Sequence, residues 1–321
     1  MKFNSLLQSN IFIYSIICLL MMNSCDVFNE DLPECRLSVK FKYDYNMRST
    51  DEFHTQVDKV TLYVFGEDDK FLFQQSAEGS LLESGDYQME LDLPVGHYKL
   101  MAWAGVHDSY EIPPLQEGVS TITDLKLRLK RDETLIIDKK LEPLWYGEIM
   151  DVNYTGEARQ AAIINLIKNT KKIRCVFQVP SNGDDTLLLE DYKFEIKASN
   201  GYLNYDNSLL EDDLLSYRPY YVEQKSSSIM IVELNTLRLL ANHEAYFTIT
   251  EKATGKTLLN INLIDFFSLV EMEGNKWGEQ EYLDRQSEYV IAFLLKDPSS
   301  AWIAAQITIN GWTLYSDEED I

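Results

Sequence analysis

The sequence contains few of the residues on which metal-binding and redox chemistry depend. Its 321 residues include four histidines and four cysteines. His54, His97, His107 and His243 each stand alone, without a second ligand at the spacing of a metal site. The CxxC, HExxH, GxSxG and GxGxxG motifs and the full Walker A loop are also absent. We therefore expect a protein that is not an enzyme, with no catalytic residues, no metal and no cofactor.

Positive charge is scarce as well. Lysine and arginine number 29 against 52 aspartates and glutamates, which gives a formal net charge of −23. A surface of this kind repels phosphate backbones, so nucleic acid is excluded as a partner. The excess of acid instead keeps a protein soluble and repels other acidic surfaces.

Long hydrophobic runs are missing except near the N-terminus. The apolar run Ile11–Met22 follows the positive Lys2 and precedes Asn23, Ser24 and Cys25. It is too short for the roughly 20 residues of a membrane-spanning helix. Residues 1–24 therefore have the pattern of a signal peptide that is removed.

Cys25 is the predicted lipid attachment site. Residues 20–25 read Leu-Met-Met-Asn-Ser-Cys and resemble a lipobox, although Met22 and Asn23 depart from its strictest form. Two or three acyl chains on Cys25 would hold the protein firmly at a membrane, which one chain would not. The alternative is ordinary cleavage near Ser24, which would leave a soluble secreted protein with an exposed thiol.

The residues after Cys25 form an acidic tether, expected over 25–35. Asp26, Asn29, Glu30 and Asp31 resemble the surface-export signal of lipoproteins in Bacteroidota. That resemblance implies transfer to the outer leaflet, and hence a surface-exposed lipoprotein of the cell outer membrane. The alternative is a solvated leash that carries no address.

Cys35 and Cys175 are the two cysteines left in the folded body. They are far apart in sequence, one before the first expected strand and one inside a later strand. A disulfide in an oxidising compartment and two separate thiols both remain open.

The rest of the chain has the pattern of an all-β protein. Leu37, Val39, Phe41 and Tyr43 alternate with polar residues, which predicts a half-buried strand. Similar short strands separated by turn residues continue to the C-terminus, with one short helix expected near 263–270. They predict two tandem β-sandwiches, over 36–157 and 158–321. The first new strand of the second sandwich is expected at 161–168.

Two local patterns carry further expectations. Residues 93–98, Leu-Pro-Val-Gly-His-Tyr, resemble a turn seen in transthyretin-like sandwiches, and Trp103 after it is expected in the core. Asp185-Thr186-Leu187 resembles the O-glycosylation acceptor of Bacteroidota, so Thr186 is a candidate glycan site. The paired acids, of which Asp212-Asp213 is one, are interpreted as turn residues, with a weak calcium site as the alternative.

The mature chain resembles the FimB-type family of fimbrial anchor subunits, which attach the type V pili of Bacteroidales to the outer membrane. The similarity is carried in order by Cys25, by 41–47 (Phe-Lys-Tyr-Asp-Tyr-Asn-Met), and by 60–65, 93–100, 102–105, 144–147, 200–203, 206–207, 280–289 and 309–312.

This resemblance implies two transthyretin-like β-sandwich domains without catalysis. It implies a lipoprotein of the fimbrium that anchors a pilus and limits its length, with the shaft pilin as partner and no small-molecule substrate. The pilin contact would be strand-mediated and non-covalent, as in β-augmentation. Arg48 is the one arginine near a conceivable processing position, although an ordinary loop residue is the simpler interpretation.

Three questions stay open at this point. Asp284-Arg285, between Tyr282 and Tyr289, is expected to form a buried ion pair or turn, with a pilin contact as the alternative. A second function, surface glycan binding, would use Trp145, Tyr146, Trp277 or Trp302 as stacking platforms. A third, surface hydrolysis, would need a cleft with paired carboxylates.

Overall fold

The structure is a computed structural model of the 321-residue chain. It describes residues 35–157, 160–179, 187–269, 277–295 and 304–316. Four β-sheets with a few short helices make up this part of the chain, which confirms the all-β prediction. No helix within the described ranges has the length and apolar character needed to cross a bilayer.

The N-terminal half is built on one seven-stranded sheet. In sheet order its strands are β3 (Phe71–Glu78), β2 (Lys59–Gly66), β5 (Gly96–Ala104), β9 (Trp145–Tyr154), β10 (Ala161–Lys168), β1 (Leu37–Lys42) and β4 (Met89–Leu91). The side-chain amide of Gln75 on β3 lies 3.5 Å from the carbonyl oxygen of Glu90 on β4, so the two edges approach each other. The sheet thus curls around a core to which Phe41, Leu62 and Leu100 belong.

The expected turn and core tryptophan of this half are present. The hydroxyl of Tyr98 donates to the carbonyl oxygen of Pro94 at 2.7 Å and closes the turn before β5. Trp103 on β5 is fully buried and packs edge-on against Tyr146. The short helix α2 (Phe53–Gln56) buries Phe53 against Phe41.

One strand lies in a different sheet from the one expected. Residues 161–168 were assigned to the second sandwich, but β10 pairs in parallel with β1 and antiparallel with β9. Parallel partners are joined by long connections, so the local pattern of β10 does not reveal its neighbour. The chain passes to the other half after β10, at Asn169 and Thr170, and we propose this point as the domain boundary.

The C-terminal half is a two-layer sandwich. One sheet has the order β15 (Tyr221–Ser226), β16 (Ile229–Thr236), β11 (Lys171–Gln178), β19 (Glu288–Leu295), β20 (Ala304–Ile309) and β21 (Trp312–Ser316). The other has the order β18 (Thr257–Asn262), β17 (Ala245–Glu251), β12 (Tyr192–Ala198), β14 (Leu215–Tyr217) and β8 (Ile136–Ile137). Between the layers, the ring of Phe177 packs on Phe194 and Phe293, with centroids 5.4 and 4.9 Å away.

Two short helices sit beside this sandwich. Helix α3 (Leu263–Ser268) confirms the helix expected near 263–270, and the side chain of Asn262 caps it by accepting from the backbone N–H of Ile264. Helix α4 (Glu279–Arg285) precedes β19.

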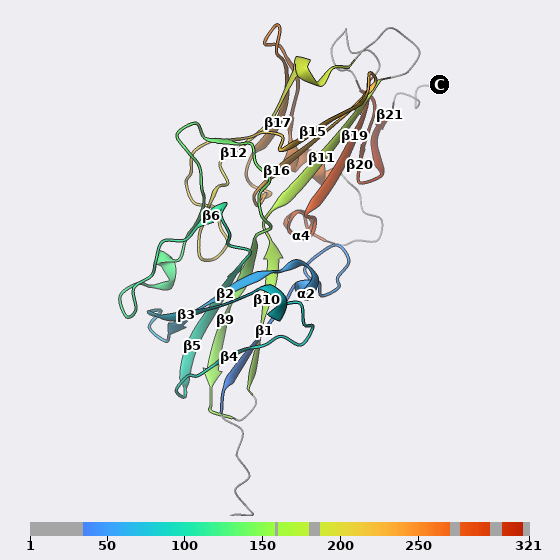
Figure 1. The fold of residues 1–321 in the computed structure, drawn as a ribbon. Coiled ribbons are helices and arrows are strands. Elements are labelled where there is room, and N and C mark those ends of the chain that lie inside the picture. The colour runs from blue at the N-terminus through green and yellow to red at the C-terminus, as the bar shows by residue number, and fades with distance from the viewer. Residues whose placement is uncertain (1–34, 158–159, 180–186, 270–276, 296–303, 317–321) are drawn as a thin grey trace, which may run out of the picture.

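The two halves exchange strands. In the fourth, three-stranded sheet, β7 (Leu127–Leu129) pairs with β6 (Tyr110–Glu111) on one side and with β13 (Tyr202–Leu203) from the C-terminal half on the other. In the opposite sense, β8 pairs with β14 of the C-terminal sandwich. Figure 1 shows the halves stacked end to end, with β1 beginning at the lower pole, far from the C-terminal sheets.

Candidate functional site

The predicted modification and sorting residues lie outside the described residues. They are Cys25, Asp26, Asn29, Glu30, Asp31 and Thr186. The described chain begins at Cys35, which is exposed, and resumes after Thr186 with Leu187, which is fully buried. Lipid attachment, surface export and glycosylation therefore stay predictions.

The two body cysteines are not joined. Cys35 is exposed, whereas Cys175 is buried in the core on β11, and both are thiols. Burial raises the pKa of Cys175 well above its ordinary value, so this thiol is unreactive.

The isolated histidines and the paired acids Asp212-Asp213 are surface residues or members of ion pairs. His107 Nε2 lies 2.9 Å from Asp58 Oδ1, while His54, His97 and His243 are exposed. Asp212 forms a buried ion pair with Arg131, and the neighbouring Asp213 lies 3.1 Å from the same guanidinium. Within the described ranges, no three His, Cys, Asp or Glu side chains come together as a metal-ligand group.

Asp284 and Arg285 are ionically paired, but not with each other. Both are in helix α4 rather than in a turn, and their side chains point to different partners. The carboxylate of Asp284 accepts from Arg238 through two bonds, at 2.9 and 2.7 Å. Arg285 donates to Glu281, one helical turn earlier, at 2.8 Å. The prediction that Asp284 forms a buried ion pair is therefore confirmed, but its partner is Arg238 and not Arg285.

A buried lysine ties helix α4 to the strand that leaves the N-terminal half. Lys171, the first residue of β11, is fully buried. Its ammonium donates to the carbonyl oxygens of Leu283, Asp284 and Gln286 at 2.5, 3.2 and 3.0 Å. Burial lowers the pKa of Lys171 to about 7, and the three carbonyls at the end of the helix offset part of this cost.

The same helix reaches the N-terminal half through Arg285. Its guanidinium carbon lies 4.1 Å from the ring centroid of Tyr45 and 4.8 Å from that of Trp277. It also donates to the carbonyl oxygen of Asn46 at 3.3 Å. We call Lys171, Arg238, Asp284 and Arg285 the α4 clasp. Since Tyr282, Leu283 and Tyr289 around it are buried, this part of the 280–289 segment packs inside the protein, and a pilin contact at the segment stays a prediction.

An open surface lies instead at one edge of the C-terminal sandwich. Strand β15 is the edge strand of the six-stranded sheet. Beside it runs a groove of about 1050 Å³, which we call the β15 groove. Val222, Leu188 and Pro219 give it apolar walls, and Val222 is 50% and Leu188 38% exposed.

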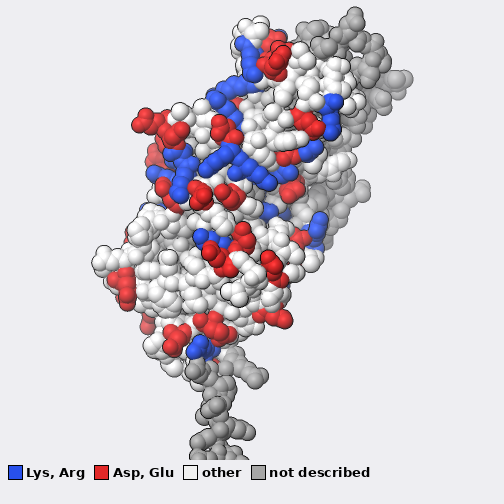
Figure 2. All heavy atoms as spheres, in the orientation of Figure 1, with Lys and Arg blue, Asp and Glu red and all other residues white. Residues whose placement is uncertain are grey.

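Positive side chains accompany the apolar walls of the β15 groove. Arg218 lines it, and its buried Nε has no hydrogen-bond partner among the described residues. Lys252 lines it too and donates to the carbonyl oxygen of Glu190 at 2.8 Å. On the face shown in Figure 2, lysines and arginines gather over the C-terminal half in an otherwise acidic protein. A buried donor without an acceptor is the kind of group that a bound partner satisfies.

The described residues thus form an interlocked all-β body in which β15 is one of the edge strands. Comparison with known families gives the particular class. The model for fimbrillin-A associated anchor proteins Mfa1 and Mfa2 matches residues 32–318, so the chain belongs to this family. This confirms the resemblance found in the sequence. The protein is a structural protein of fimbrial anchoring and not an enzyme.

Individual relatives match this chain over most of its length. The minor fimbrium anchoring subunit Mfa2 of Porphyromonas gingivalis is 21% identical over 310 residues, which cover 93% of this chain and 92% of that protein. The solved structure of that fimbrial anchor protein has a TM-score of 0.69, with 88% of this chain and 99% of the other covered. A Bacteroides thetaiotaomicron structure, described as a candidate polysaccharide-binding protein, is 53% identical with a TM-score of 0.83, and covers 90% and 100% of the two chains.

Proposed function

We propose that this protein is a surface-exposed outer-membrane lipoprotein that holds the base of a type V fimbria and limits its length. Acyl chains on Cys25 would fix it in the membrane, and Asp26, Asn29, Glu30 and Asp31 would direct it to the outer leaflet. The observation that carries the proposal is the family match over residues 32–318, which begins a few residues after the predicted lipid site.

The arrangement of the two halves supports this role. The described chain enters β1 at the pole remote from the C-terminal sandwich (Figure 1). A lipid on residue 25 would therefore leave the C-terminal half as the end that extends from the membrane, with the β15 groove available to a partner. We propose that the shaft pilin makes its strand-mediated contact there, with main-chain hydrogen bonds along β15 and apolar side chains against Val222 and Leu188.

Anchoring is tested with cells that lack the protein and are complemented with wild type or Cys25→Ala. Wild type should retain fimbriae on cells. In cells with Cys25→Ala, fimbriae should be released into the medium together with the anchor protein. In cells that lack the protein altogether, the fimbriae should also be longer than those of wild type. Mass spectrometry of the mature N-terminus checks the lipid directly. An unmodified Cys25 in a strain that still retains its fimbriae would refute the lipid anchor.

The pilin contact is tested separately with Val222→Asp. The aspartate should abolish co-purification of the anchor with fimbriae, because it replaces the apolar contact of the half-exposed Val222 with a carboxylate that pilin binding would have to desolvate. Val290→Asp is the matched control, since Val290 on β19 is 45% exposed and lies outside this groove. Equal retention of fimbriae by both variants would exclude the groove and leave anchoring itself untouched.

The platforms expected for the glycan-binding alternative are largely closed. Trp145 and Tyr146 are 1% and 6% exposed, so the prediction that they stack on sugars is wrong. Trp277 packs against Arg285 in the clasp region, and Trp302 lies outside the described residues. The 53% identical relative carries a polysaccharide-binding description, and glycan stacking on Trp277 or Trp302 stays a prediction.

A further inference from the structure

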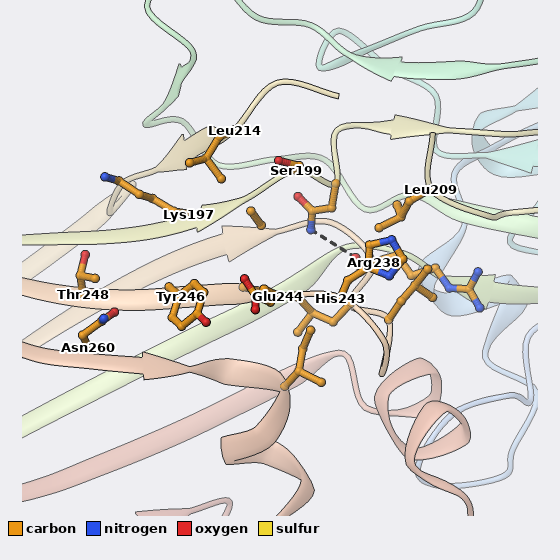
Figure 3. Close-up of a pocket in the computed structure, with 16 residues that line it drawn as sticks. Lys197, Ser199, Leu209, Leu214, Arg238, His243, Glu244, Tyr246, Thr248 and Asn260 are labelled. Atoms are coloured by element: carbon orange, nitrogen blue, oxygen red, sulfur yellow. Dashed lines mark hydrogen bonds between the residues drawn. The ribbon is translucent and has the colours of Figure 1, made fainter. Parts of the chain in front are cut away.

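A second cavity lies on the outer face of the five-stranded sheet. It has a volume of about 550 Å³, within the range of ligand pockets. Strands β12, β17 and β18 form its floor, and the connections 204–214 and 238–244 contribute its walls (Figure 3). It is separate from the β15 groove, because the two share no lining residue.

The floor of this pocket carries one aromatic ring among polar groups. Tyr246 on β17 is opposite Lys197 on β12, and Thr248, two residues further, is opposite Asn260 on β18. Since residues two apart on a strand share a face, these four side chains belong to one patch. Figure 3 shows the ring of Tyr246 between Thr248 and Glu244.

The opposite wall is apolar. Leu209 and Leu214 from the 204–214 connection and Leu240 from the 238–244 connection line it, and Leu214 is 58% exposed. A ligand in this pocket therefore meets hydrocarbon on one side. On the other side it meets a ring bordered by an amide, a hydroxyl, an ammonium and a carboxylate.

The charges of the pocket favour a neutral ligand. Arg238 is committed to Asp284 in the α4 clasp, and Lys197 Nζ lies 3.8 Å from the carboxylate of Glu195. The carboxylate of Glu244 raises the pKa of the neighbouring Tyr246, and its charge would repel a bound anion. Arg238 is neutralised by Asp284 and Glu244 opposes Lys197 in charge, so the Lys, Arg and Glu side chains that line the pocket supply no net positive charge to hold a phosphate or a uronate.

The backbone here is already paired. Strand β17, which carries Tyr246 and Thr248, bonds to β12 on one side and to β18 on the other throughout the pocket, so an extended peptide cannot pair with this strand. Recognition has to come from side chains. A sugar ring fits such a surface, because its C–H face packs on an aromatic ring while the hydroxyls at its rim bond to amide, hydroxyl and carboxylate groups.

We propose that this pocket binds a neutral saccharide, with Tyr246 as the stacking platform and Thr248, Asn260 and Glu244 bonding to the sugar hydroxyls. The site is independent of fimbrial anchoring. It would let the base of the fimbria hold a neutral glycan of the cell surface while the β15 groove serves the pilin.

The test applies the mature protein to an array of neutral and uronate-containing oligosaccharides, and then titrates the best neutral probe by calorimetry. We expect binding to neutral glycans only, and a loss of about tenfold or more in affinity for Tyr246→Ala. Asn260→Ala should weaken binding as well. Tyr221→Ala is the matched control, because Tyr221 is an exposed tyrosine of β15 outside this pocket.

Three results would overturn the saccharide site: no binding to any neutral glycan on the array, a preference for uronates, or equal affinity of Tyr246→Ala and wild type. Thermal unfolding of Tyr246→Ala at the wild-type temperature verifies its fold. Cells carrying Tyr246→Ala should retain their fimbriae, so a failure of this site and a failure of the anchor role are read out separately.

Discussion

At the scale of single residues, a few buried polar side chains stabilise the fold through their ion pairs and hydrogen bonds. Lys171 is the clearest case, because its ammonium is met by three backbone carbonyls at the end of α4 and forms no ion pair with a carboxylate of the described residues. Removing one partner of such a buried group leaves the others unsatisfied, which costs more than the bonds themselves contribute.

We predict that Lys171→Met lowers the free energy of unfolding by about 2–4 kcal/mol, since three carbonyls lose their donor inside the protein. Urea denaturation measures this. Lys172→Met is the matched control, because the side chain of Lys172 is 40% exposed and Glu233, its partner, keeps its pair with Arg174. Its loss should stay below about 1 kcal/mol. Equal losses would mean that the clasp lysine is dispensable.

Glu233 makes the free energy of unfolding depend on pH in the acidic range. Burial acts to raise its pKa, but hydrogen bonds from Tyr220 and Arg174 and the charge of Lys172 outweigh this, and the pKa lies below its ordinary value. A carboxylate with a lowered folded pKa stabilises the protein above its unfolded pKa, near 4.3, and this contribution disappears as pH falls below it.

We therefore predict that wild type loses about 1 kcal/mol more than Glu233→Gln between pH 6 and pH 3. Urea titrations at both pH values supply the four free energies needed. Parallel acid dependence of the two proteins would show that Glu233 has the same pKa folded and unfolded.

At the scale of elements, backbone geometry decides where strands end. Gly105 follows β5 with φ +73°, and a Cβ there would lie 1.9 Å from the carbonyl oxygen of Pro143. The chain therefore needs glycine at this turn both for its left-handed conformation and for the close approach of the segment that leads into β9. Gly118 has a similar φ of +69° but no neighbouring atom within 4 Å.

These two glycines make a matched pair. Gly118→Ala should cost about 1 kcal/mol, from the strained conformation alone. Gly105→Ala should cost about 3 kcal/mol or more, because Pro143 and the strand after it have to move. Thermal or urea unfolding of both variants checks the prediction, and it fails if the two differ by less than the error of the measurement.

At the scale of the whole molecule, the two halves are interlocked. Strands β8 and β13 each pair in a sheet with the other half. The Arg131–Asp212 pair is buried, with 8% and 1% of its side chains exposed, and the α4 clasp joins the halves at a further point. These shared contacts should make the two halves unfold together.

We predict that the mature protein unfolds in one calorimetric transition, with the van't Hoff enthalpy equal to the calorimetric enthalpy. Arg285→Ala should lower the temperature of that single transition, since it removes the contacts with Tyr45 and Asn46. Arg48→Ala should leave it in place, because the side chain of Arg48 is 82% exposed. Two resolved transitions in the wild-type protein would show that the halves are independent.

The sequence predicted those features that depend on neighbouring residues. Cys175 was expected inside a strand, and Ile173, Cys175 and Phe177 alternate as fully buried residues of β11. The turn before Tyr98 and the helix α3 were likewise predictable. The partner of β10, the partner of Asp284 and the burial of Trp145 were not, because each depends on segments that lie far away along the chain.

The sequence by itself therefore determined the fold class, the family and the absence of recognisable enzyme motifs, because period-two alternation, turn residues and ordered motifs are local properties of a chain. Only the tertiary structure decided that the 280–289 segment clasps the halves, that the edge at β15 is open, and that Tyr246 lies in a pocket with Asn260 and Leu214. Surfaces and buried pairs arise from contacts between distant segments, and the free energy of those contacts depends on several stretches of sequence at once.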